Sequence, residues 1–397
     1  EGEEVGLRVF VGQRSASVSS SDLSVDALQE AVERAVAMAR EAPEDAYAGL
    51  APAELLMHET PRDLDIDDGG EISAEKLKDM ALAAEDAARA VAGVTNSEGG
   101  SASSGRAVMA LATSTGFARG YHGTSYGVSA SVIAGEGTGM QRDYAYHSSR
   151  FATDLETPES IGLRAGTRAV RRLNPIKLDT QSLPVVFDPR VGGGMLSALI
   201  GAITGSSIAR KTSFLLDAMG TQVFAPGIRI IDQPHRLRGL RSKPFDGEGL
   251  PTAERAIIDD GVLTGWLMES ASARQLGLTP TGHAARGVSG PPGAGTSNLH
   301  MAAGSTSRAD MIGSIKYGLY VTEMIGMGVN GLTGDYSRGA SGFLIENGEL
   351  TVPVAEVTIA GNLKDMFRAI VPADDLEFRY ATNVPTLRID GMTLAGA

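Results

Sequence analysis

The sequence predicts an α+β protein, with N-terminal and central segments that mix helices, strands and a β-meander, followed by a mainly β C-terminal domain. Two observations carry this prediction. Three amphipathic patterns, each preceded by a Ser or Thr that can cap a helix, fall in the first half of the chain. The second half instead contains strand-like runs joined by Asp-Gly and Asn-Gly turns. We therefore expect domains at residues 1–59, 60–181 and 182–397.

The N-terminal domain is expected to begin with a strand and continue with a helix. The strand covers residues 5–11, and a serine-rich run leads from it to Ser24, the expected N-cap. Apolar residues then recur every three or four positions, at Leu28, Ala31, Val32, Ala35 and Val36. Residues 43–71 are rich in Pro, Ala and acidic side chains, which indicates a connection between domains.

The central domain is expected to hold two helices and a β-meander. One helix runs from Ser73 to about Ala92, and a second begins at Thr157-Pro158, the order of an N-cap followed by proline, and ends near Leu173. Residues 106–146 alternate apolar and polar side chains, as strands do. Glycines punctuate this run at Gly116, Gly123 and residues 135–137.

The C-terminal domain is expected to open with a buried strand at residues 184–187, a glycine turn at 192–194 and an apolar helix from Met195. Two hairpins follow, turning at Asp260-Gly261 and at Asn347-Gly348, dipeptides that accept the positive φ of a tight turn. A long loop of Gly, Ser, Pro and Ala covers about Gly282 to Ser307. Ser307 and Asp310 then resemble a capping box that starts another helix.

Composition limits the classes of partner. The chain has 397 residues and a formal charge of −13, which opposes binding to nucleic acid. The basic stretch at 235–243 is short, so we interpret it as a solvated loop. No run approaches the roughly 20 apolar residues of a membrane helix. The absence of cysteine fits a reducing cytoplasm. The chain begins abruptly inside a predicted strand, so we expect that the native protein starts further upstream.

Sequence-local metal and anion sites are weakly supported. The six histidines, none within a helical turn or two of another, are His58, His122, His147, His235, His283 and His300. A zinc site assembled from distant histidines stays an alternative. The acidic run at 63–69 begins like a calcium loop but has Asp68 where the turn needs glycine and Ala74 where a glutamate should close the cage, which favours a solvated linker. The glycines at 192–194 fit close backbone packing better than an anion site.

Two nucleophile patterns match by residue type but not by context. Ser125 lies in a Gly-x-Ser-x-Gly string, yet an alternating strand pattern follows it instead of a helix. Ser73 and Lys76 form a Ser-x-x-Lys pair, but Ser73 is better explained as a helix N-cap. Neither pattern predicts a catalytic serine.

Long ordered segments resemble the TldD/PmbA family, and within it the PmbA (TldE) branch. The most specific are GVNGLTGDYSRGASGFLIENGELTVPVAEVTIAGNLKDMF (328–367) and PTLRIDGMTLAG (385–396). Shorter matches lie at residues 15–24, 94–101, 142–150, 210–217 and 244–249. The resemblance runs over essentially the whole chain and implies the TldD/PmbA fold.

The same resemblance implies a lost metal site. The TldD branch resembles a zinc peptidase with an HExxxH helix and a C-terminal cysteine. This chain has Ser197 and Ala198 where that motif has its first His and its Glu, Ala202 where it has the second His, and no cysteine. Serine and alanine supply neither zinc ligands nor a general base. We therefore expect no catalytic residue, no metal and no cofactor in this chain.

The strongest remaining polar cluster is Gly334-Asp335-Tyr336-Ser337-Arg338, with Glu346 and Asn347 further along. We consider two interpretations. The cluster contacts a peptide or a partner subunit, since glycines admit close approach and Arg binds carboxylates. Alternatively it is a structural turn held by an ion pair between Asp335 and Arg338.

Three functions follow from these observations. The first is a non-catalytic subunit of a cytoplasmic metallopeptidase, paired with a zinc-bearing TldD-type chain in a heterodimer, or with itself when alone. The resemblance implies substrates that are unfolded or modified peptides, including peptide-antibiotic precursors and antitoxins. The second is a stand-alone peptidase with a relocated site at Asp335, Glu346 and scattered histidines. The third is a regulatory protein that binds gyrase.

Overall fold

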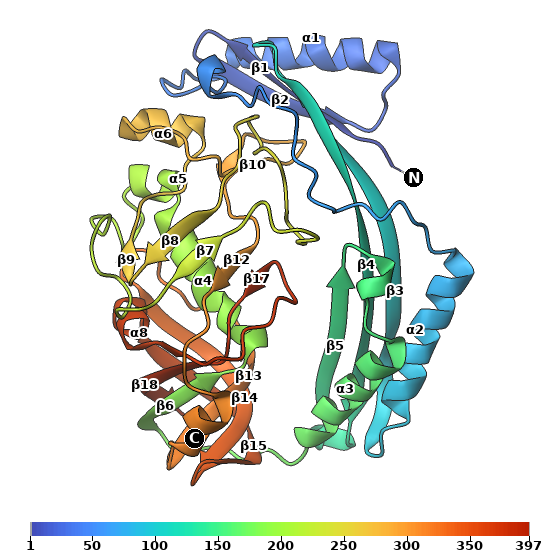
Figure 1. Cartoon of the computed structure of the whole chain (residues 1–397), viewed down its shortest axis with the longest axis vertical. Helices are drawn as coiled ribbons and strands as arrows, with labels where there is room; N and C mark the ends of the chain where they lie inside the picture. Colours follow the sequence, from blue (N-terminus) through green and yellow to red (C-terminus); the bar gives the residue numbers. More distant parts are fainter. Residues whose placement is uncertain (1, 397) are drawn as a thin grey trace.

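The computed structural model describes residues 2–396. At one end of the molecule, helix α1 (Val25–Glu41) covers a hairpin of β1 (Val5–Val11) and β2 (Arg14–Ser20) (Figure 1). Ser24 caps α1 by accepting the Ala27 amide, which confirms the predicted N-cap. The serine-rich run is strand β2 and not a connection. It pairs with β1 along its whole length and needs only Val18 to be buried against the helix.

The central part is a three-stranded antiparallel sheet with two helices on one face (Figure 1). Its elements are α2 (Ala74–Arg89), β3 (Val94–Ala112), β4 (Ala118–Ala134), β5 (Gln141–Ser149) and α3 (Pro158–Arg171). Small residues allow the two helices to approach closely: a Cβ built on Gly162 of α3 would lie 2.1 Å from the carbonyl oxygen of Ala84. The other face of the sheet is left without helices.

Two predictions about this sheet are wrong in detail. Strand β3 begins at Val94 and not near Arg106, because its first half carries Ser and Gly toward the uncovered face and so lacks the apolar alternation of a half-buried strand. Gly123 lies inside β4 and not in a turn. A Cβ there would lie 3.0 Å from the carbonyl oxygen of Ile66, so glycine permits the acidic segment to cross the strand.

The acidic segment at residues 63–69 is not a solvated linker. Leu64 and Ile66 are buried. Asp67 pairs with Arg106 at 2.8 Å, and Asp68 accepts a hydrogen bond of 2.6 Å from the hydroxyl of Tyr126. The segment therefore packs across the long β3–β4 hairpin and is bound to it.

The C-terminal part is built on a closed five-stranded barrel, in which the order β15-β14-β13-β6-β18 is completed by pairing of β18 with β15. The strands are β6 (Gln181–Phe187), β13 (Tyr317–Ile325), β14 (Asp335–Glu346), β15 (Glu349–Asn362) and β18 (Leu387–Ala395). The predicted Asn-Gly hairpin joins β14 to β15, with φ of 51° at Asn347 and 84° at Gly348. These findings confirm the α+β prediction with a mainly β C-terminal domain.

A second sheet, in the order β17-β12-β7-β8-β9, packs into the same core. Its strands are β7 (Ile230–Asp232), β8 (Arg255–Asp259), β9 (Val262–Leu263), β12 (Leu299–Met301) and β17 (Thr382–Asn383). Short elements complete the domain: α5 (Gly205–Ala209), α6 (Ser270–Leu276), β10 (Ala284–Ala285), β11 (Gly293–Ala294), α7 (Arg308–Gly313), α8 (Leu363–Ala369) and β16 (Val371–Pro372). Over residues 2–396, no helix has the length and apolar character needed to cross a lipid bilayer.

Helix α4 (Pro189–Ile203) follows β6 directly, so the predicted glycine turn at 192–194 is wrong. Asp188 caps the helix by accepting the Arg190 amide, and Pro189 occupies the first turn. The N-cap and the proline favour a helix start here more strongly than the three glycines at 192–194 disfavour a helix. A Cβ on Gly192 would lie 2.9 Å from a methyl of Val384, which supports the interpretation of close packing. The other carboxylate oxygen of Asp188 accepts the Tyr320 hydroxyl at 2.8 Å, which fixes α4 to the barrel.

Buried ion pairs fix the central sheet to the C-terminal domain. Arg190, at the start of α4, makes a bidentate pair with Asp143 of β5, at 2.7 and 3.2 Å. Arg172 contacts the same carboxylate at 3.5 Å and also pairs with Glu323 of β13. Burial alone raises the pKa of Asp143, but the hydrogen bonds and charge of Arg190, with the charge of Arg172, outweigh it and hold the pKa below its usual range.

Candidate functional site

Helix α4 carries the three positions that match the lost metal motif. Ser197 is exposed, and its hydroxyl donates to the carbonyl oxygen of Gly193 at 3.3 Å. Ala198 is half-buried and Ala202 is buried in the core. Alanine has no ligand atom, and the hydroxyl of Ser197 is a poor zinc ligand. The residues at these positions therefore do not fit the metal that the HExxxH motif would hold.

The cluster at residues 334–338 is the start of strand β14, and the predicted ion pair is wrong. Asp335 accepts hydrogen bonds from Thr333 at 2.6 Å and Asn362 at 3.0 Å, which hold its pKa below the usual range. Asp335 is exposed while Tyr336 is buried, and burial raises the pKa of Tyr336 to about 12. Residues three apart on a strand point to opposite faces, so Asp335 cannot face Arg338.

Arg338 instead reaches toward helix α4. A Cβ built on Gly194 would lie 3.6 Å from its Nη1 atom, one turn of α4 before Ser197. Its Nε atom is buried and has no hydrogen-bond partner within residues 2–396. The structure thus brings together two features that the sequence predicted separately, the cluster on β14 and the α4 segment.

An exposed apolar loop lies next to this arginine. It joins β13 to β14 and pairs with the start of β14 through the Val329–Tyr336 bridge. Met327, Val329 and Leu332 of the loop are exposed, with Met327 fully exposed, and so is Ile325 at the end of β13.

Glu346 and Asn347 lie at the far end of β14, in the hairpin turn, so they do not join Arg338 in one site. The Gly282–Ser307 loop also lies elsewhere. It contains β10, β11 and β12, and a Cβ on Gly6 of β1 would clash with the carbonyl oxygen of Val288 at 1.9 Å. The loop therefore packs against the N-terminal hairpin.

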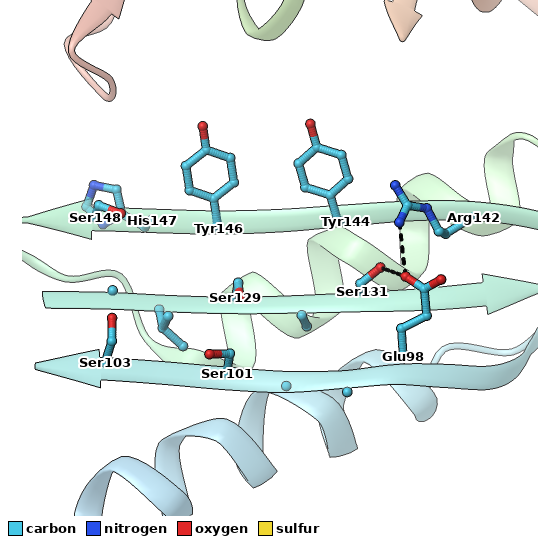
Figure 2. Close-up of a pocket in the computed structure, with 15 residues that line it drawn as sticks. Glu98, Ser101, Ser103, Ser129, Ser131, Arg142, Tyr144, Tyr146, His147 and Ser148 are labelled. Atoms are coloured by element: carbon cyan, nitrogen blue, oxygen red, sulfur yellow. Dashed lines mark hydrogen bonds and ion pairs between the residues drawn. The ribbon is translucent and has the colours of Figure 1, made fainter. Parts of the chain in front are cut away.

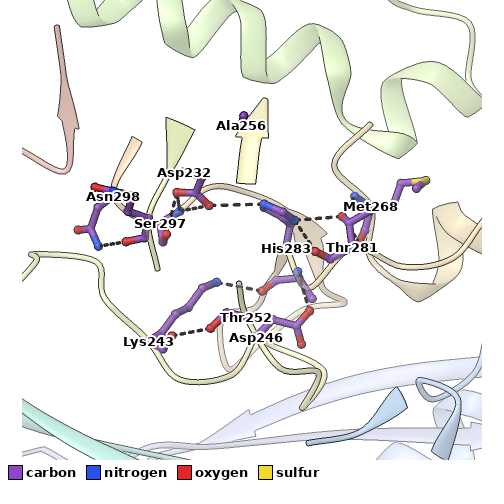
Figure 3. Close-up of polar contacts among 12 residues, drawn as sticks. Asp232, Lys243, Asp246, Thr252, Ala256, Met268, Thr281, His283, Ser297 and Asn298 are labelled. Atoms are coloured by element: carbon purple, nitrogen blue, oxygen red, sulfur yellow. Dashed lines mark hydrogen bonds and ion pairs between the residues drawn. The ribbon is translucent and has the colours of Figure 1, made fainter. Parts of the chain in front are cut away.

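His283, Asp232 and Ser297 form a buried polar cluster (Figure 3). Nε2 of His283 lies 3.5 Å from the carboxylate of Asp232, and the Ser297 hydroxyl donates to the same carboxylate at 2.7 Å. A catalytic serine must instead contact the histidine. The cluster fixes the 282–307 loop to the second sheet. Within residues 2–396, no three His, Cys, Asp or Glu side chains are grouped as a metal site.

A broad hollow lies on the uncovered face of the central sheet (Figure 2). This cleft has a volume of about 580 Å³ and is lined by Ser and Gly of β3 and β4 and by Tyr144 and Tyr146 of β5. A second pocket of about 250 Å³ shares His147 and Ser148 with the cleft. It continues between β5 and segments of the C-terminal domain.

Sequence reasoning missed both hollows. The stretch at 235–243, predicted to be a solvated loop, packs against the protein, and its Arg236 and Arg238 line the second pocket. The alternation of Tyr, Ser and Arg at residues 142–150 was the available signal for a polar sheet face. It shows neither that this face is uncovered nor what lies opposite.

Comparisons with known proteins agree over the whole chain. Residues 1–39, 67–173 and 180–396 match domain 1, the central domain and the C-terminal domain of PmbA/TldA metallopeptidases. Metalloprotease PmbA of Escherichia coli O157:H7 is 43% identical over 99% of this chain and 85% of its own length. The Metalloprotease PmbA homolog of Haemophilus influenzae is 39% identical over the same shares.

Solved structures agree with these matches. A structure described as a candidate modulator of DNA gyrase from Bacteroides thetaiotaomicron has a TM-score of 0.91 and 28% identity, covering 99% of this chain and 88% of that one. The fold of TldE from Thermococcus kodakarensis is also alike, with a TM-score of 0.84 at 21% identity, covering 99% of this chain and 94% of that one. The chain belongs to the PmbA/TldD metallopeptidase family, in its PmbA branch.

Proposed function

We propose that this chain is the non-catalytic subunit of a two-chain metallopeptidase that acts on unfolded or modified peptides in the cytoplasm. Its partner is a TldD-type chain that carries HExxxH and zinc and so supplies the metal-bound water and the general base. The observation that carries this proposal is the composition of α4, where Ser197, Ala198 and Ala202 stand at the three motif positions. Without imidazole or carboxylate there, chemistry has to come from another chain.

Metal content and activity test this assignment. We expect the purified chain to hold no stoichiometric zinc by elemental analysis and to leave an unfolded test peptide intact. The peptide should be cleaved once a TldD-type chain with HExxxH is added. One tightly bound zinc per chain would overturn the assignment. Cleavage by the isolated chain that survives a chelator would instead favour a stand-alone peptidase, and capture of gyrase without a TldD-type partner would favour a gyrase-binding regulator.

Arg338 and the apolar loop beside it are the proposed contact with the partner or its peptide. Main-chain pairing of a peptide with the start of β14 is excluded, because residues 335–338 pair with β15 on one side and hydrogen-bond to Gly328 and Asn330 on the other. Of the five donors of the Arg338 guanidinium, the one at Nε has no hydrogen-bond partner within residues 2–396. Four exposed apolar side chains lie next to Arg338. Arg and Met, both present in this group, are residue types enriched at protein interfaces.

Replacing Arg338 by Ala should therefore lower the activity of the assembled complex about tenfold, the loss of one charge-assisted contact. Peptidase rates with the TldD-type partner measure this, and the melting temperature of the variant alone should stay close to that of the unchanged chain. Arg368→Ala, which removes an exposed side chain on α8 of the same domain, is the matched control and should change neither. If the Arg338→Ala complex kept full activity, or if the variant chain unfolded, the role of Arg338 would be structural and the proposed contact would be wrong.

A further inference from the structure

The cleft on the central sheet and the second pocket, which lies between this sheet and the C-terminal domain, together form one groove. His147 and Ser148 of β5 line both hollows, so the two adjoin at this strand. The floor is the sheet face opposite α2 and α3, and the far end is bounded by Arg236, Phe378 and Tyr380 of the C-terminal domain. The ion pairs of Asp143 hold its two sides together.

The floor of the groove displays unused hydroxyl groups. Ser101, Ser103, Ser129 and Ser148 come from three neighbouring strands, and Figure 2 shows them along the same sheet. None of these hydroxyls makes a hydrogen bond to another residue in the described range 2–396. Each can donate and accept, which suits the alternating N–H and C=O groups of an extended peptide.

Aromatic side chains form one wall. Tyr144 and Tyr146 point the same way from β5 (Figure 2) and stack with ring centroids 6.2 Å apart, while Tyr380 lies 5.5 Å from Tyr146. Burial, with Tyr380 and Tyr144 nearby, raises the pKa of Tyr146 to about 12. Its hydroxyl therefore stays protonated and neutral at physiological pH.

The far end of the groove is positively charged. Four arginines and one aspartate line the second pocket. Arg238 is neutralised by Asp65 and Asp154, and Arg379 by Glu156. Within residues 2–396, the other two arginines, Arg150 and Arg236, have no carboxylate partner.

These two arginines differ in what they contact. Arg150 donates only to backbone carbonyl oxygens, those of Thr124, Gly239 and Leu240. Arg236 stacks on the ring of Phe378 at 3.4 Å and makes no side-chain hydrogen bond or ion pair within residues 2–396. In a chain with a net charge of −13, this pocket is a local concentration of positive charge, which favours an anionic ligand.

We propose that the groove binds an extended peptide whose carboxylate is held by Arg236, with support from the charge of Arg150. The serine floor binds the main chain without regard to sequence, and the tyrosines pack against side chains. This inference deepens the proposed function, because it takes peptides as the molecules that the complex handles. It assigns to this chain a capture site on the central sheet, apart from α4 and Arg338.

Calorimetric titration of the isolated chain tests the proposal, so the result does not depend on any partner or on zinc. The first probe is a short peptide of Gly, Ala and Gln, acetylated at its N-terminus and with a free C-terminal carboxylate. The second probe is the same peptide amidated at its C-terminus, and the third is the amidated peptide with a Glu near its end. We expect the free carboxylate to bind about tenfold or more tightly than the amide, the effect of one charge-assisted contact. The third probe shows whether a side-chain carboxylate is also accepted.

Variants locate the site. Arg236→Gln should abolish the preference for the carboxylate, and Ser129→Trp, which fills the cleft from the central strand, should prevent binding of all three peptides. Arg89→Gln is the control, because Arg89 is 61% exposed on α2, against the opposite face of the same sheet. No binding of the first peptide, equal binding of the first two, or a preference that survives Arg236→Gln would overturn the proposal. So would a single-stranded oligonucleotide that binds more tightly than the first peptide and is weakened by Arg236→Gln. None of these outcomes bears on whether the chain lacks zinc or needs a partner.

Discussion

Replacing Asp143 by Ala is expected to lower the free energy of unfolding by about 3–5 kcal/mol, because removing one member of a buried charge network leaves the charge of Arg190 unpaired. Asp143 is 2% exposed and faces Arg190 and Arg172, whose side chains are each 10% exposed. Arg190 has no other acidic partner within residues 2–396. Chemical denaturation followed by tryptophan fluorescence and circular dichroism measures the loss.

The matched control is Asp259→Ala, which removes an ion pair with Arg229 whose two side chains are both more than half exposed. Such a surface pair contributes only about 0–1 kcal/mol. A similar small loss for Asp143→Ala would contradict a stabilising role for the buried network.

The pH dependence of this loss has a definite sign. The pKa of Asp143 is lowered in the folded protein, so its contribution to stability is present above the unfolded pKa of about 3.9 and disappears as the pH falls through the folded pKa. The difference in stability between the unchanged chain and Asp143→Ala should therefore be constant above about pH 5 and shrink below about pH 4. A difference that grows on acidification would be the wrong sign.

Local sequence signals predicted most helix starts and tight turns correctly, because these features depend on neighbouring residues alone. Ser24, Ser73 and Thr157 each accept a backbone amide at the start of a helix. Asp260 and Asn347 each take positive φ in a hairpin turn. The rest of the fold prediction came from the resemblance to the TldD/PmbA family.

Features that depend on long-range contacts were missed or wrong. The first half of β3 has no apolar alternation, since one of its faces lines a polar cleft and does not pack against a core. Closure of the barrel by pairing of β15 with β18 leaves no trace in either strand's pattern. Asp335 and Arg338 were interpreted as an ion pair that could hold a turn, but a strand places them on opposite faces.

The candidate site likewise combines features that the sequence predicts with features that only the fold shows. Residue identities at 197, 198 and 202 follow from the resemblance, whereas the approach of Arg338 to Gly194 follows from barrel geometry. The charges of Arg150 and Arg236, which no carboxylate within residues 2–396 neutralises, are visible only after folding, because the residues that line their pocket come from four separate segments. Sequence patterns identify side chains with reactive or charged groups. Which of these groups remain without a partner depends on the fold.

A single methyl group at Gly342 should also destabilise the protein, by about 3 kcal/mol, at the upper end of the range for overpacking. Gly342 lies on β14 where the pairing with both neighbours is irregular, opposite Val321 of β13. A Cβ there would lie 1.8 Å from the carbonyl oxygen of Tyr320, a backbone atom that cannot move without separating β13 from β14. Tyr320 also donates its hydroxyl to Asp188, the N-cap of α4. A displacement of Tyr320 would therefore also strain the helix that carries the candidate site.

The test compares Gly342→Ala with Gly313→Ala in chemical denaturation. At Gly313, in the last turn of α7, a Cβ would meet no atom within 4 Å, so alanine should be neutral or slightly stabilising there. Because β13 also carries Glu323, which pairs with Arg172, displacement of this strand should weaken the interdomain network as well. Gly342→Ala and Asp143→Ala are therefore expected to be less destabilising together than the sum of their separate effects. Strict additivity would show that the barrel strand and the interdomain ion pairs are independent.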